Sequence, residues 1–327
     1  MSADLVKRQH FVPRTYLKHF GVSEDSKEYF VHVLPSSSKN KEEISSKNIK
    51  NVAMEKHLYT LPGETIAEKM AIEKFYHNEF ENHYDSIYQM LTNPEINEVN
   101  EKEKELIIST VVTMYYRTTK LLNGKKDFMR QTFDQLFNLC QQTGKDYFIF
   151  DGVKMSIAGK TLDEFTNEFN KKNQARMILT QLMVAFRLIE IRLNDSICVV
   201  RIDDEDMEFV TSDNPVTASN IGNNHITPFD PSNVLSLPLD SKHILKLIPK
   251  SSEGLDNRIY RRVLKSPLSG FEKLTSNYSQ MQNSERFMFG SKSALESYLA
   301  TKQESERPLN QSETAKDVYP KLKDLGL

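Results

Sequence analysis

The stretch SICVVRIDDEDMEFVTS, residues 196–212, decides the fold class because the spacing of apolar residues changes here. Before it, apolar residues recur every three or four positions, which is the period of one helix face. Within it, the runs SICVVRI and MEFVTS alternate or are β-branched like strands, and the acidic turn DDED between them predicts a hairpin. The chain is therefore expected to be helical before residue 196 and rich in strands after it.

The part of the chain before this stretch, about residues 1–193, is expected to form a helical block. Asn100 with Glu103, and Thr161 with Glu164, have the spacing of a capping box, in which side chains satisfy free backbone groups at a helix start. A short strand is expected at 28–34, before a polar loop, and a strand and turn at YFIFDG, 147–152. The apolar periodicity predicts helices at about residues 65–91, 100–120, 126–142 and 161–192.

The part after this stretch, about residues 194–302, is expected to be a β-rich block with closing helices. VLSLPLD (234–240) and HILKLIP (243–249) predict strands, and helical spacing returns from about residue 258. Because helices and strands are segregated along the chain, we predict an α+β fold in which a large helical block packs on a small, mostly antiparallel sheet. Residues 1–302 are expected to form a single domain, and residues 303–327 a polar C-terminal tail.

The composition excludes several classes of protein. Among 327 residues, 43 Lys and Arg stand against 45 Asp and Glu, so the net charge of −2 gives no overall attraction to nucleic acid or an anionic membrane. A polyanion would have to be held by a local basic patch. The sequence has no signal-peptide pattern and no run of about 18 apolar residues, and its two cysteines form no Cys-x-x-Cys pair. We expect a cytoplasmic protein that does not span a membrane.

The opening stretch KRQHFVPRTYLKHFG, residues 7–21, combines basic and aromatic residues around a proline. It predicts an amphipathic first helix that begins near Pro13 and buries Tyr16, Leu17 and Phe20. His10 precedes the proline in extended backbone, where its imidazole could turn into a cleft. Arg14 is a candidate for binding an anionic substrate.

Two further segments place charged residues beside apolar stripes. In EKFYHNEFENHYD (73–85), carboxylates and imidazoles lie four positions apart, which suits either a metal ligand such as Glu73 or an ordinary ion-paired surface. Arg117, in MYYRTTK, follows the aromatic end of a predicted helix stripe. Its guanidinium suits a bidentate grip on phosphate or carboxylate, or a structural ion pair with an acidic side chain such as Glu73.

The segment FVTSDNPV, residues 209–216, is the strongest local signal. A predicted strand ends at Thr211, and Ser212, Asp213 and Asn214 then supply a hydroxyl, a carboxylate and an amide directly before Pro215. Polar groups at the end of a buried strand are often reacting or binding groups. The same residues also have ideal turn chemistry, which needs no function.

Several segments in order resemble the bacterial and fungal family named domain of unknown function 4238, over about residues 10–289. They are QHFVPRTYLKHF, NVAMEKHLYT, YYRTT, FVTSDNPV, PLD and SNYSQMQNSERFMFG. The family pattern contains His-x-x-Pro, Leu-Arg-Thr-Pro and Ser-Asp-Asn-Pro, and this chain departs from it at Thr119, where the family has proline. The matching residues are His10, Pro13, Arg117, Ser212, Asp213, Asn214 and Pro215. Because the family has no known activity, the resemblance implies a single-domain unit and a set of site residues, but no reaction.

These residues support the hypothesis of a phosphodiester hydrolase, similar to a nuclease of a defence or toxin kind. His10 would act as general acid or base, Asp213 would orient it or hold a divalent cation, and Arg117 would neutralise phosphoryl charge. Ser212 and Asn214 would fix the substrate. The three catalytic candidates would then have to meet at the wall of an accessible cavity.

The hypothesis also names a cofactor and a partner. Glu73 is the further carboxylate that could hold a magnesium or manganese ion with Asp213. Nucleic acid or a nucleotide would be steered by local basic residues, namely Lys7, Arg8, Arg14, Arg258, Arg261 and Arg262. The alternative hypothesis is a non-catalytic interaction module in which the same polar residues form a structural network.

Overall fold

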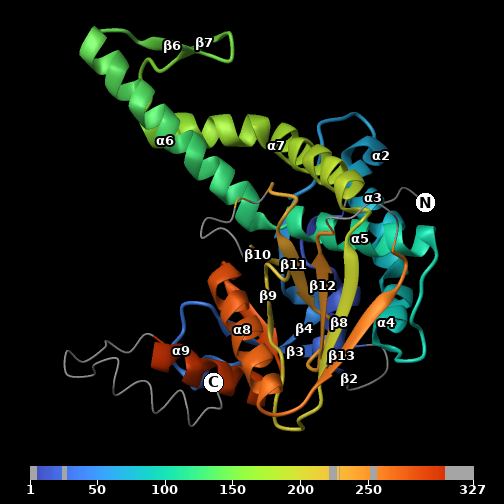
Figure 1. Cartoon of the computed structure of the whole chain (residues 1–327). Helices are drawn as coiled ribbons and strands as arrows, with labels where there is room; N and C mark the ends of the chain where they lie inside the picture. Colours follow the sequence, from blue (N-terminus) through green and yellow to red (C-terminus); the bar gives the residue numbers. More distant parts are fainter. Residues whose placement is uncertain (1–5, 24–27, 221–226, 228, 251–255, 306–327) are drawn as a thin grey trace.

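A computed structural model of the chain describes residues 6–23, 28–220, 227, 229–250 and 256–305. Two five-stranded sheets, two short antiparallel ribbons and a set of helices make up the part of the chain so described (Figure 1). The predicted α+β class is confirmed, with two sheets where the sequence suggested one.

The first sheet comes entirely from the C-terminal half of the chain. Neighbouring strands in the order β10-β11-β12-β8-β13 are antiparallel, except that β13 runs parallel to β8. The two predicted strands at 234–240 and 243–249 form the hairpin β11–β12, whereas β13 lies where the sequence suggested helix. The strands are β8 (Ser196–Ile202), β10 (Thr217–Ser219), β11 (Val234–Pro238), β12 (His243–Ile248) and β13 (Ile259–Leu264).

The predicted hairpin between residues 196–202 and 207–212 is wrong. Both edges of β8 are occupied, by β12 on one side and β13 on the other, so the next segment has no free edge to pair with. The chain leaves the sheet, and β9 (Thr211–Ser212) pairs with β14 (Phe287–Gly290). This segment therefore connects the two sheets.

The second sheet joins the two ends of the chain. Its order is β2-β3-β14-β9, with β4 also paired to β3, so C-terminal β14 lies between β3 and β9. The strand predicted at 28–34 is confirmed, and part of the polar loop expected after it is β4. The first sixty residues are thus richer in strands than the sequence suggested. The strands are β1 (Arg8–His10), β2 (Val22–Ser23), β3 (Tyr29–Pro35), β4 (Ser45–Asn48) and β5 (Met54–Lys56), of which β1 and β5 pair separately.

The predicted helices are present with different boundaries. Both capping boxes form, at Asn100 and at Thr161. The helix expected at 65–91 is broken at Met70 and Phe80, and a 3-10 turn, Glu81–His83, follows the second break. The helices are α1 (Arg14–Leu17), α2 (Ile66–Lys69), α3 (Ala71–Glu79), α4 (Tyr84–Thr92), α5 (Glu101–Tyr116), α6 (Thr119–Thr143) and α7 (Leu162–Arg192).

Helices α6 and α7 project from the body as an arm with a hairpin at its tip (Figure 1). The hairpin consists of β6 (Tyr147–Phe150) and β7 (Val153–Ser156), which confirms the strand and turn predicted there. The outer half of the arm has an aromatic core of its own. It contains Phe133, Phe137, Phe148 and Phe165.

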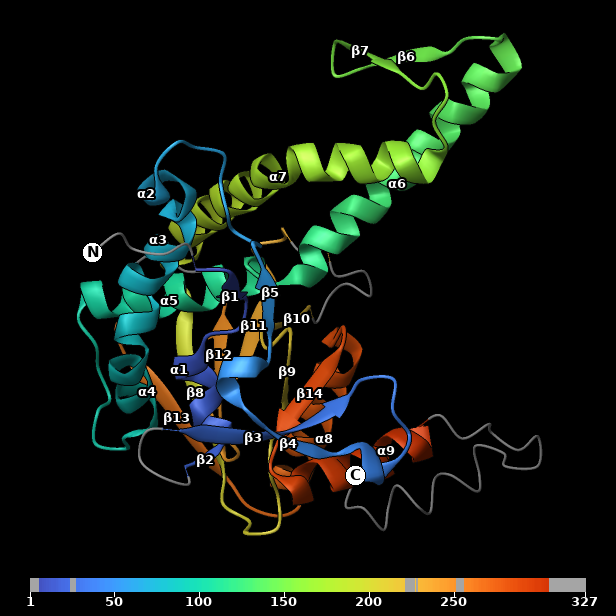
Figure 2. The same cartoon turned by 180° about the vertical axis from the view of Figure 1, so that it is seen from behind.

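The remaining helices, α8 (Leu268–Asn283) and α9 (Lys292–Ser305), close the fold beside the second sheet. Figure 2, the view from behind, shows β1 and β5 at the level of α5 and α1 below it, in front of the first sheet. The main core lies here, between the opening stretch, the helices α3 to α5 and the first sheet. Across the described ranges, no helix has the length and apolar character needed to cross a bilayer.

Candidate functional site

The opening stretch is firmly anchored and carries His10 into the body of the protein. His10 ends β1, which pairs with β5, and α1 begins directly after Pro13. The predicted burial is confirmed for Tyr16, Leu17 and Phe20. The backbone that presents His10 is therefore held by strand pairing on one side and by core packing on the other.

Arg117 lies beside His10 and is only 5% exposed. Its guanidinium donates to the His10 carbonyl oxygen at 2.6 Å and to the Glu81 carboxylate at 2.9 Å, and lies 4.3 Å from the centre of the Tyr76 ring. Burial acts to lower the pKa of Arg117, but the charge of Glu81 together with the contributions of Tyr59 and Tyr76 outweighs it, and the pKa is raised. The structural ion pair suggested for Arg117 is present, but its acidic partner is Glu81 and not Glu73. The 3-10 turn brings Glu81 to Arg117.

The His10 imidazole is held in its neutral form. Burial, followed by the charge of Arg14, lowers the pKa of His10 to about 4. The Lys50 backbone opposes this shift. Nε2 is buried without a hydrogen-bond partner among the described residues, so this ring nitrogen is the one that a bound molecule could still bond.

Glu73 is the second group of this region with an unpartnered atom. Burial raises the pKa of its carboxyl to about 7, even though the charge of Arg117 opposes the shift. Its Oε2 atom is buried and accepts no hydrogen bond from the residues that the structure describes. The carboxyl is thus close to half-protonated at neutral pH, which is the state a general acid requires. His10, Arg14, Glu73, Glu81 and Arg117 are together called the His10 cluster.

A pocket of about 200 Å³ opens next to the His10 cluster. Arg14, Lys50 and Glu81 line it, so residues that bond His10 and Arg117 reach its wall. Arg14 is exposed and forms no ion pair within the described part of the chain. Its guanidinium is therefore available to an anion that enters the pocket.

Asp213 has a different environment from the one predicted. It is fully buried, and four N–H donors point at its carboxylate. The backbone N–H groups of residues 285–287 donate at 2.9, 2.7 and 3.2 Å, and the Asn214 amide donates at 3.3 Å. Burial raises the pKa of Asp213, while these donors oppose the shift. The carboxylate holds the chain in place before β14.

The structure brings His10 and Arg117 together but does not bring Asp213 to them. Neither residue is a hydrogen-bond partner of Asp213 or a charge that acts on its pKa. Arg286 fills the space on that side, with Nε 3.9 Å from the Asp213 carboxylate and its guanidinium 5.0 Å from the Phe11 ring. Asp213 therefore does not orient His10, and the expected three-residue constellation reduces to two of its members.

The other polar residues of Ser212–Pro215, here called the SDNP segment, bond to α8. The Ser212 hydroxyl donates to the Gln280 side-chain oxygen at 2.7 Å, and the Gln280 amide donates to the Pro215 carbonyl at 2.6 Å. The Asn283 amide donates to the Asn214 carbonyl at 2.7 Å. The exception is Asn214 Oδ1, which is buried without a partner in the described residues, at a cavity of about 460 Å³.

A further contact connects the opening stretch to β9. The Tyr16 hydroxyl lies 2.6 Å from Thr211 Oγ1 and donates to the Pro238 carbonyl at 2.9 Å. Both side chains are fully buried. The SDNP segment is therefore part of a bonded network that joins the opening stretch, α8 and both sheets, as the structural hypothesis requires.

The two predicted metal ligands lie in different environments, Glu73 in the His10 cluster and Asp213 among backbone donors. Within the described ranges, no three His, Cys, Asp or Glu side chains are grouped so as to hold a metal ion. Asp213 could bind a cation only by giving up N–H donors. Glu73, whose Oε2 is unpartnered, is the better candidate of the two.

The C-terminal basic patch expected from sequence is smaller in the structure. Arg261 donates to the backbone carbonyls of residues 90, 91 and 96 and so closes the end of α4. Arg258 pairs with Asp256 at 3.3 Å. Arg262 is exposed. Arg258 is exposed as well, but the Asp256 carboxylate partly neutralises its charge, so steering of a polyanion would depend mainly on the opening stretch and Arg262.

Sequence reasoning missed Glu81, Lys50 and Arg286. Glu81 was visible in the four-residue spacing with His77, but its pairing with Arg117 depends on the break at Phe80. Lys50 acts through its backbone carbonyl, which no side-chain pattern can reveal. Arg286 contacts Glu55 at 3.0 Å and approaches Asp213, and both contacts require the pairing of chain ends in the second sheet.

The comparisons with known proteins agree with the resemblance in the motifs. The model of the family described as protein of unknown function (DUF4238) matches residues 8–296, so the chain belongs to this family. No curated protein and no solved structure matches the chain. The family brings no activity with it, and a function has to be argued from the residues of the site.

Proposed function

We propose that this member of the DUF4238 family is a phosphodiester hydrolase with nuclease-like activity, and that the His10 cluster is its active site. The observation that supports this most strongly is the pair of buried atoms, His10 Nε2 and Glu73 Oε2, that have no partner among the described residues. They belong to a cluster whose Arg14 and Glu81 line a pocket, although His10 and Glu73 themselves lie behind its wall. Leaving buried polar atoms without partners costs about 1–3 kcal/mol each. A substrate that supplies the missing partners offsets this cost.

The opposite pKa shifts give the two groups complementary roles. His10, with its pKa lowered to about 4, is neutral at pH 5 to 7, and its Nε2 lone pair can take a proton from water. Glu73, with its pKa raised to about 7, keeps its proton up to that pH and can give it to a leaving oxygen. The two groups therefore act as base and acid in the same pH range.

The proposed reaction is attack of water on the phosphorus of a diester. The bond between water oxygen and phosphorus forms as the bond from phosphorus to the leaving oxygen breaks. The water proton goes to His10, and the leaving oxygen receives the Glu73 proton; exchange with solvent restores both groups. Arg14, at the pocket wall, binds the phosphate oxygens, and Arg117 adds positive charge from behind while holding the His10 backbone.

The proposed reaction steps use no metal ion. Magnesium and manganese are nevertheless varied in the assay, because Glu73 is a candidate ligand for either ion. Three residues have no part in the proposed chemistry, because their side chains are already hydrogen-bonded within the protein. Ser212 bonds Gln280, Gln280 bonds the Pro215 carbonyl, and Asp213 accepts from the backbone of Glu285. Asn214 reaches a separate cavity through its unpartnered Oδ1.

The test is hydrolysis of bis(p-nitrophenyl) phosphate and of single-stranded DNA and RNA oligonucleotides, with magnesium, with manganese and with EDTA. His10→Gln and Glu73→Gln should each lower kcat/KM by about 10²–10⁴, which is the usual contribution of general acid–base catalysis. The matched control is His83→Ala, because His83 is an exposed histidine at the end of the 3-10 turn. It should retain the wild-type rate.

The pH profile distinguishes the proposed roles from simple damage. Wild-type kcat/KM should rise through the His10 pKa of about 4 and fall through the Glu73 pKa of about 7. In Glu73→Gln the residual activity should lack the fall near pH 7. Absence of hydrolysis by the wild type under every condition of this panel would refute the proposal.

A second function, binding without turnover, is favoured by one observation: Arg117 is already taken up by Glu81 and by the His10 carbonyl. In that case the pocket would bind an anion through Arg14 and release it unchanged. Arg14→Ala would then lower the affinity for an oligonucleotide or nucleotide, while the wild type would leave the ligand intact.

A further inference from the structure

Helix α8 has the reverse of the usual polarity of a surface helix: polar residues on its buried side and apolar residues on its exposed side. Its buried side is polar: Ser269 donates to Asp204, Asn277 accepts from the Val210 N–H at 3.0 Å, and Gln280 bonds the SDNP segment. Its outer side is apolar. The exposed fractions of these outer residues are 46–58%, for Leu268, Phe271, Leu274 and Tyr278. A surface helix normally buries its apolar stripe and exposes its polar one.

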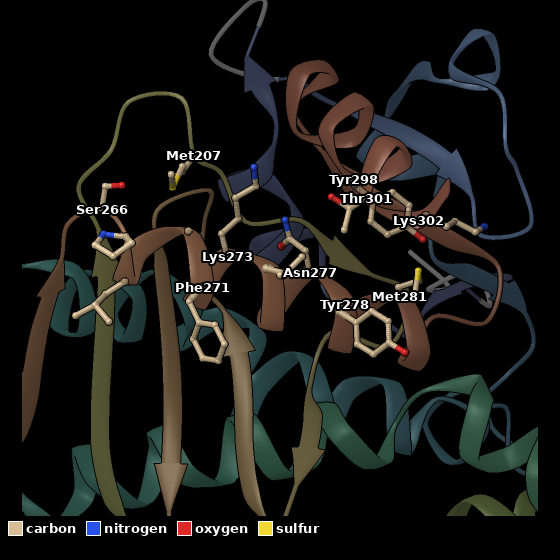
Figure 3. A pocket seen from close by; sticks show the side chains of 14 residues that line it. Met207, Ser266, Phe271, Lys273, Asn277, Tyr278, Met281, Tyr298, Thr301 and Lys302 are labelled. Carbon is tan, nitrogen blue, oxygen red and sulfur yellow. The ribbon is translucent and has the colours of Figure 1, made fainter. Parts of the chain in front are cut away.

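This apolar side borders a groove of about 540 Å³ (Figure 3). One wall is α8, with Phe271, Tyr278 and Met281, and the opposite rim is α9, with Tyr298 and Thr301. The lining is mostly carbon and sulfur. A contiguous apolar surface of this kind usually marks an interaction site.

We propose that the groove binds the C-terminal segment of the same chain, Val318–Leu327. The groove's rim includes Thr301 in the last turns of α9, and α9 ends at Ser305. The chain thus leaves the described structure at the groove's own edge. Beyond that point the sequence continues as ERPLNQSETAKDVYPKLKDLGL, residues 306–327.

The sequence of this segment has the pattern that an apolar groove beside a helix accepts. Leu322 and Leu325 are three positions apart, the spacing of one helix face, and Pro320 before them suits the first turn of a helix. Val318 and Tyr319 precede this turn and add apolar surface in extended backbone. Residues 306–317 before it are polar. An amphipathic segment that lays its apolar side into a groove is a recurrent mode of peptide recognition.

The polar residues 306–317 are long enough to serve as the tether. Fully extended, they span roughly 40 Å, whereas α8 is roughly 24 Å long, so every part of the stripe lies within reach. A short flexible tether gives an effective concentration on the order of 1 mM. A segment with an intrinsic Kd of about 0.1 mM would therefore be docked about nine-tenths of the time.

The absence of tryptophan from the chain permits a clean test. Tyr319→Trp places a single tryptophan in the segment, and docking should shift its emission to the blue and lower its quenching by acrylamide several-fold relative to the free peptide 306–327. Phe271→Asp in the groove, or Leu322→Asp together with Leu325→Asp in the segment, should return the emission to that of the free peptide. A protein that ends at Ser305 should bind the labelled peptide, and the same protein with Phe271→Asp should not.

Two control variants are matched to these changes. Phe128→Asp places the same charge on an exposed phenylalanine of α6. Phe128 is 65% exposed and Phe271 is 50% exposed. Ser312→Asp places it in the tether. Both should leave the emission of the Tyr319→Trp protein unchanged.

The result that overturns the proposal is a tryptophan that emits like the free peptide and does not respond to Phe271→Asp. An emission shift that depends on protein concentration would also overturn it, since the groove would then bind the segment of a second copy. If the protein self-associates and Phe271→Asp abolishes this without changing the emission of the tryptophan introduced at position 319, the groove would be a direct contact between two copies of the chain.

Discussion

The His10 cluster and the SDNP segment contain the same kinds of residue, yet they differ in how their polar atoms are satisfied. In the SDNP segment, Asp213 accepts four N–H donors. In the His10 cluster, His10 Nε2 and Glu73 Oε2 are buried without any partner in the described residues. The residue types suggested a site in both regions. The partners of the titratable groups separate the two regions, although Asn214 Oδ1 in the SDNP segment also lacks a partner among the described residues.

The difference also has an energetic side. Burial raises the pKa of both carboxyls, but Asp213 has compensating donors and Glu73 has only the distant charges of arginines. Ionisation therefore costs stability at both carboxyls, but at Asp213 four donors depend on the carboxylate as their acceptor. Removing Asp213 should therefore lower stability, whereas neutralising Glu73 should raise it at high pH and lower activity.

The largest expected effect is that of Asp213→Ala on stability. It leaves three backbone N–H groups and one amide group without their acceptor. We expect a loss of about 3–5 kcal/mol in the free energy of unfolding, measured by urea denaturation at pH 7. Asp163→Ala, at an exposed aspartate of α7, should cost less than about 0.5 kcal/mol. If Asp213→Ala kept wild-type stability and lost hydrolysis, Asp213 would belong with the catalytic residues.

The second effect is a pair of opposite pH dependences within the His10 cluster. The folded-state pKa of Glu73, about 7, lies above the ordinary glutamate value of 4.5, so its stabilising protonation is fully present below pH 4.5 and lost as pH rises through 7. Glu73→Gln should thus match the wild type at pH 4 and be more stable by roughly 2–3 kcal/mol at pH 8.

For His10 the sign is reversed. Its folded-state pKa, about 4, lies below the ordinary histidine value of 6.5, so stability is lost as pH falls from 6.5 to 4. His10→Gln should match the wild type at pH 7.5 and be more stable by roughly 2–3 kcal/mol at pH 4. Urea denaturation across this range measures both differences. If the stability of each variant stayed at a constant difference from the wild type across this pH range, Glu73 and His10 would not be buried as described.

The third effect concerns the bonds from α8 to the SDNP segment. Gln280→Ala removes the bonds to Ser212 and Pro215 and should cost about 1–3 kcal/mol, with hydrolysis unchanged. Gln282→Ala, an exposed glutamine of the same helix, should cost less than about 0.5 kcal/mol. In a double-mutant cycle, Ser212→Ala with Gln280→Ala should show a coupling of about 0.5–2 kcal/mol. No coupling would mean that this bond contributes nothing to the network.

The smallest effect is expected at the rim of the Arg14 pocket. Lys18, which lines the pocket, pairs with Asp85 at 2.5 Å, and the Asp85 side chain is 55% exposed. Such surface pairs contribute about 0.2–1 kcal/mol and weaken with salt. Asp85→Ala should therefore change stability by less than about 1 kcal/mol and leave hydrolysis intact. A large loss of activity would extend the active site to this rim.

Local signals predicted much of the fold. The capping boxes at Asn100 and Thr161 and the burial of Tyr16 and Leu17 depend on neighbours in the sequence, and both are confirmed. The hairpin after residue 196 could not be judged in this way. Its failure results from β13, a distant strand that occupies the second edge of β8.

The sequence predicted which residue types form the candidate site better than it predicted which of them meet in space. His10 and Arg117 meet because strand pairing of β1 and the end of α5 bring them together. Glu81 joins them only because the helix breaks at Phe80, and Asp213 stays apart because backbone N–H groups of residues 285–287 occupy it. Partners that belong to the backbone of a distant segment leave no trace in the pattern of side chains.

The arm of α6 and α7 has a mechanical consequence. α6 begins two residues after Arg117, and its first turns donate to Glu285 through Thr119 at 2.6 Å and Asn123 at 2.7 Å. Glu285 starts the loop that grips Asp213. Helix α6 is roughly 37 Å long, and its first turn lies between the His10 cluster and the SDNP segment. A load on the hairpin at its tip would be transmitted to His10's neighbour and to the anchor of Asp213 at once.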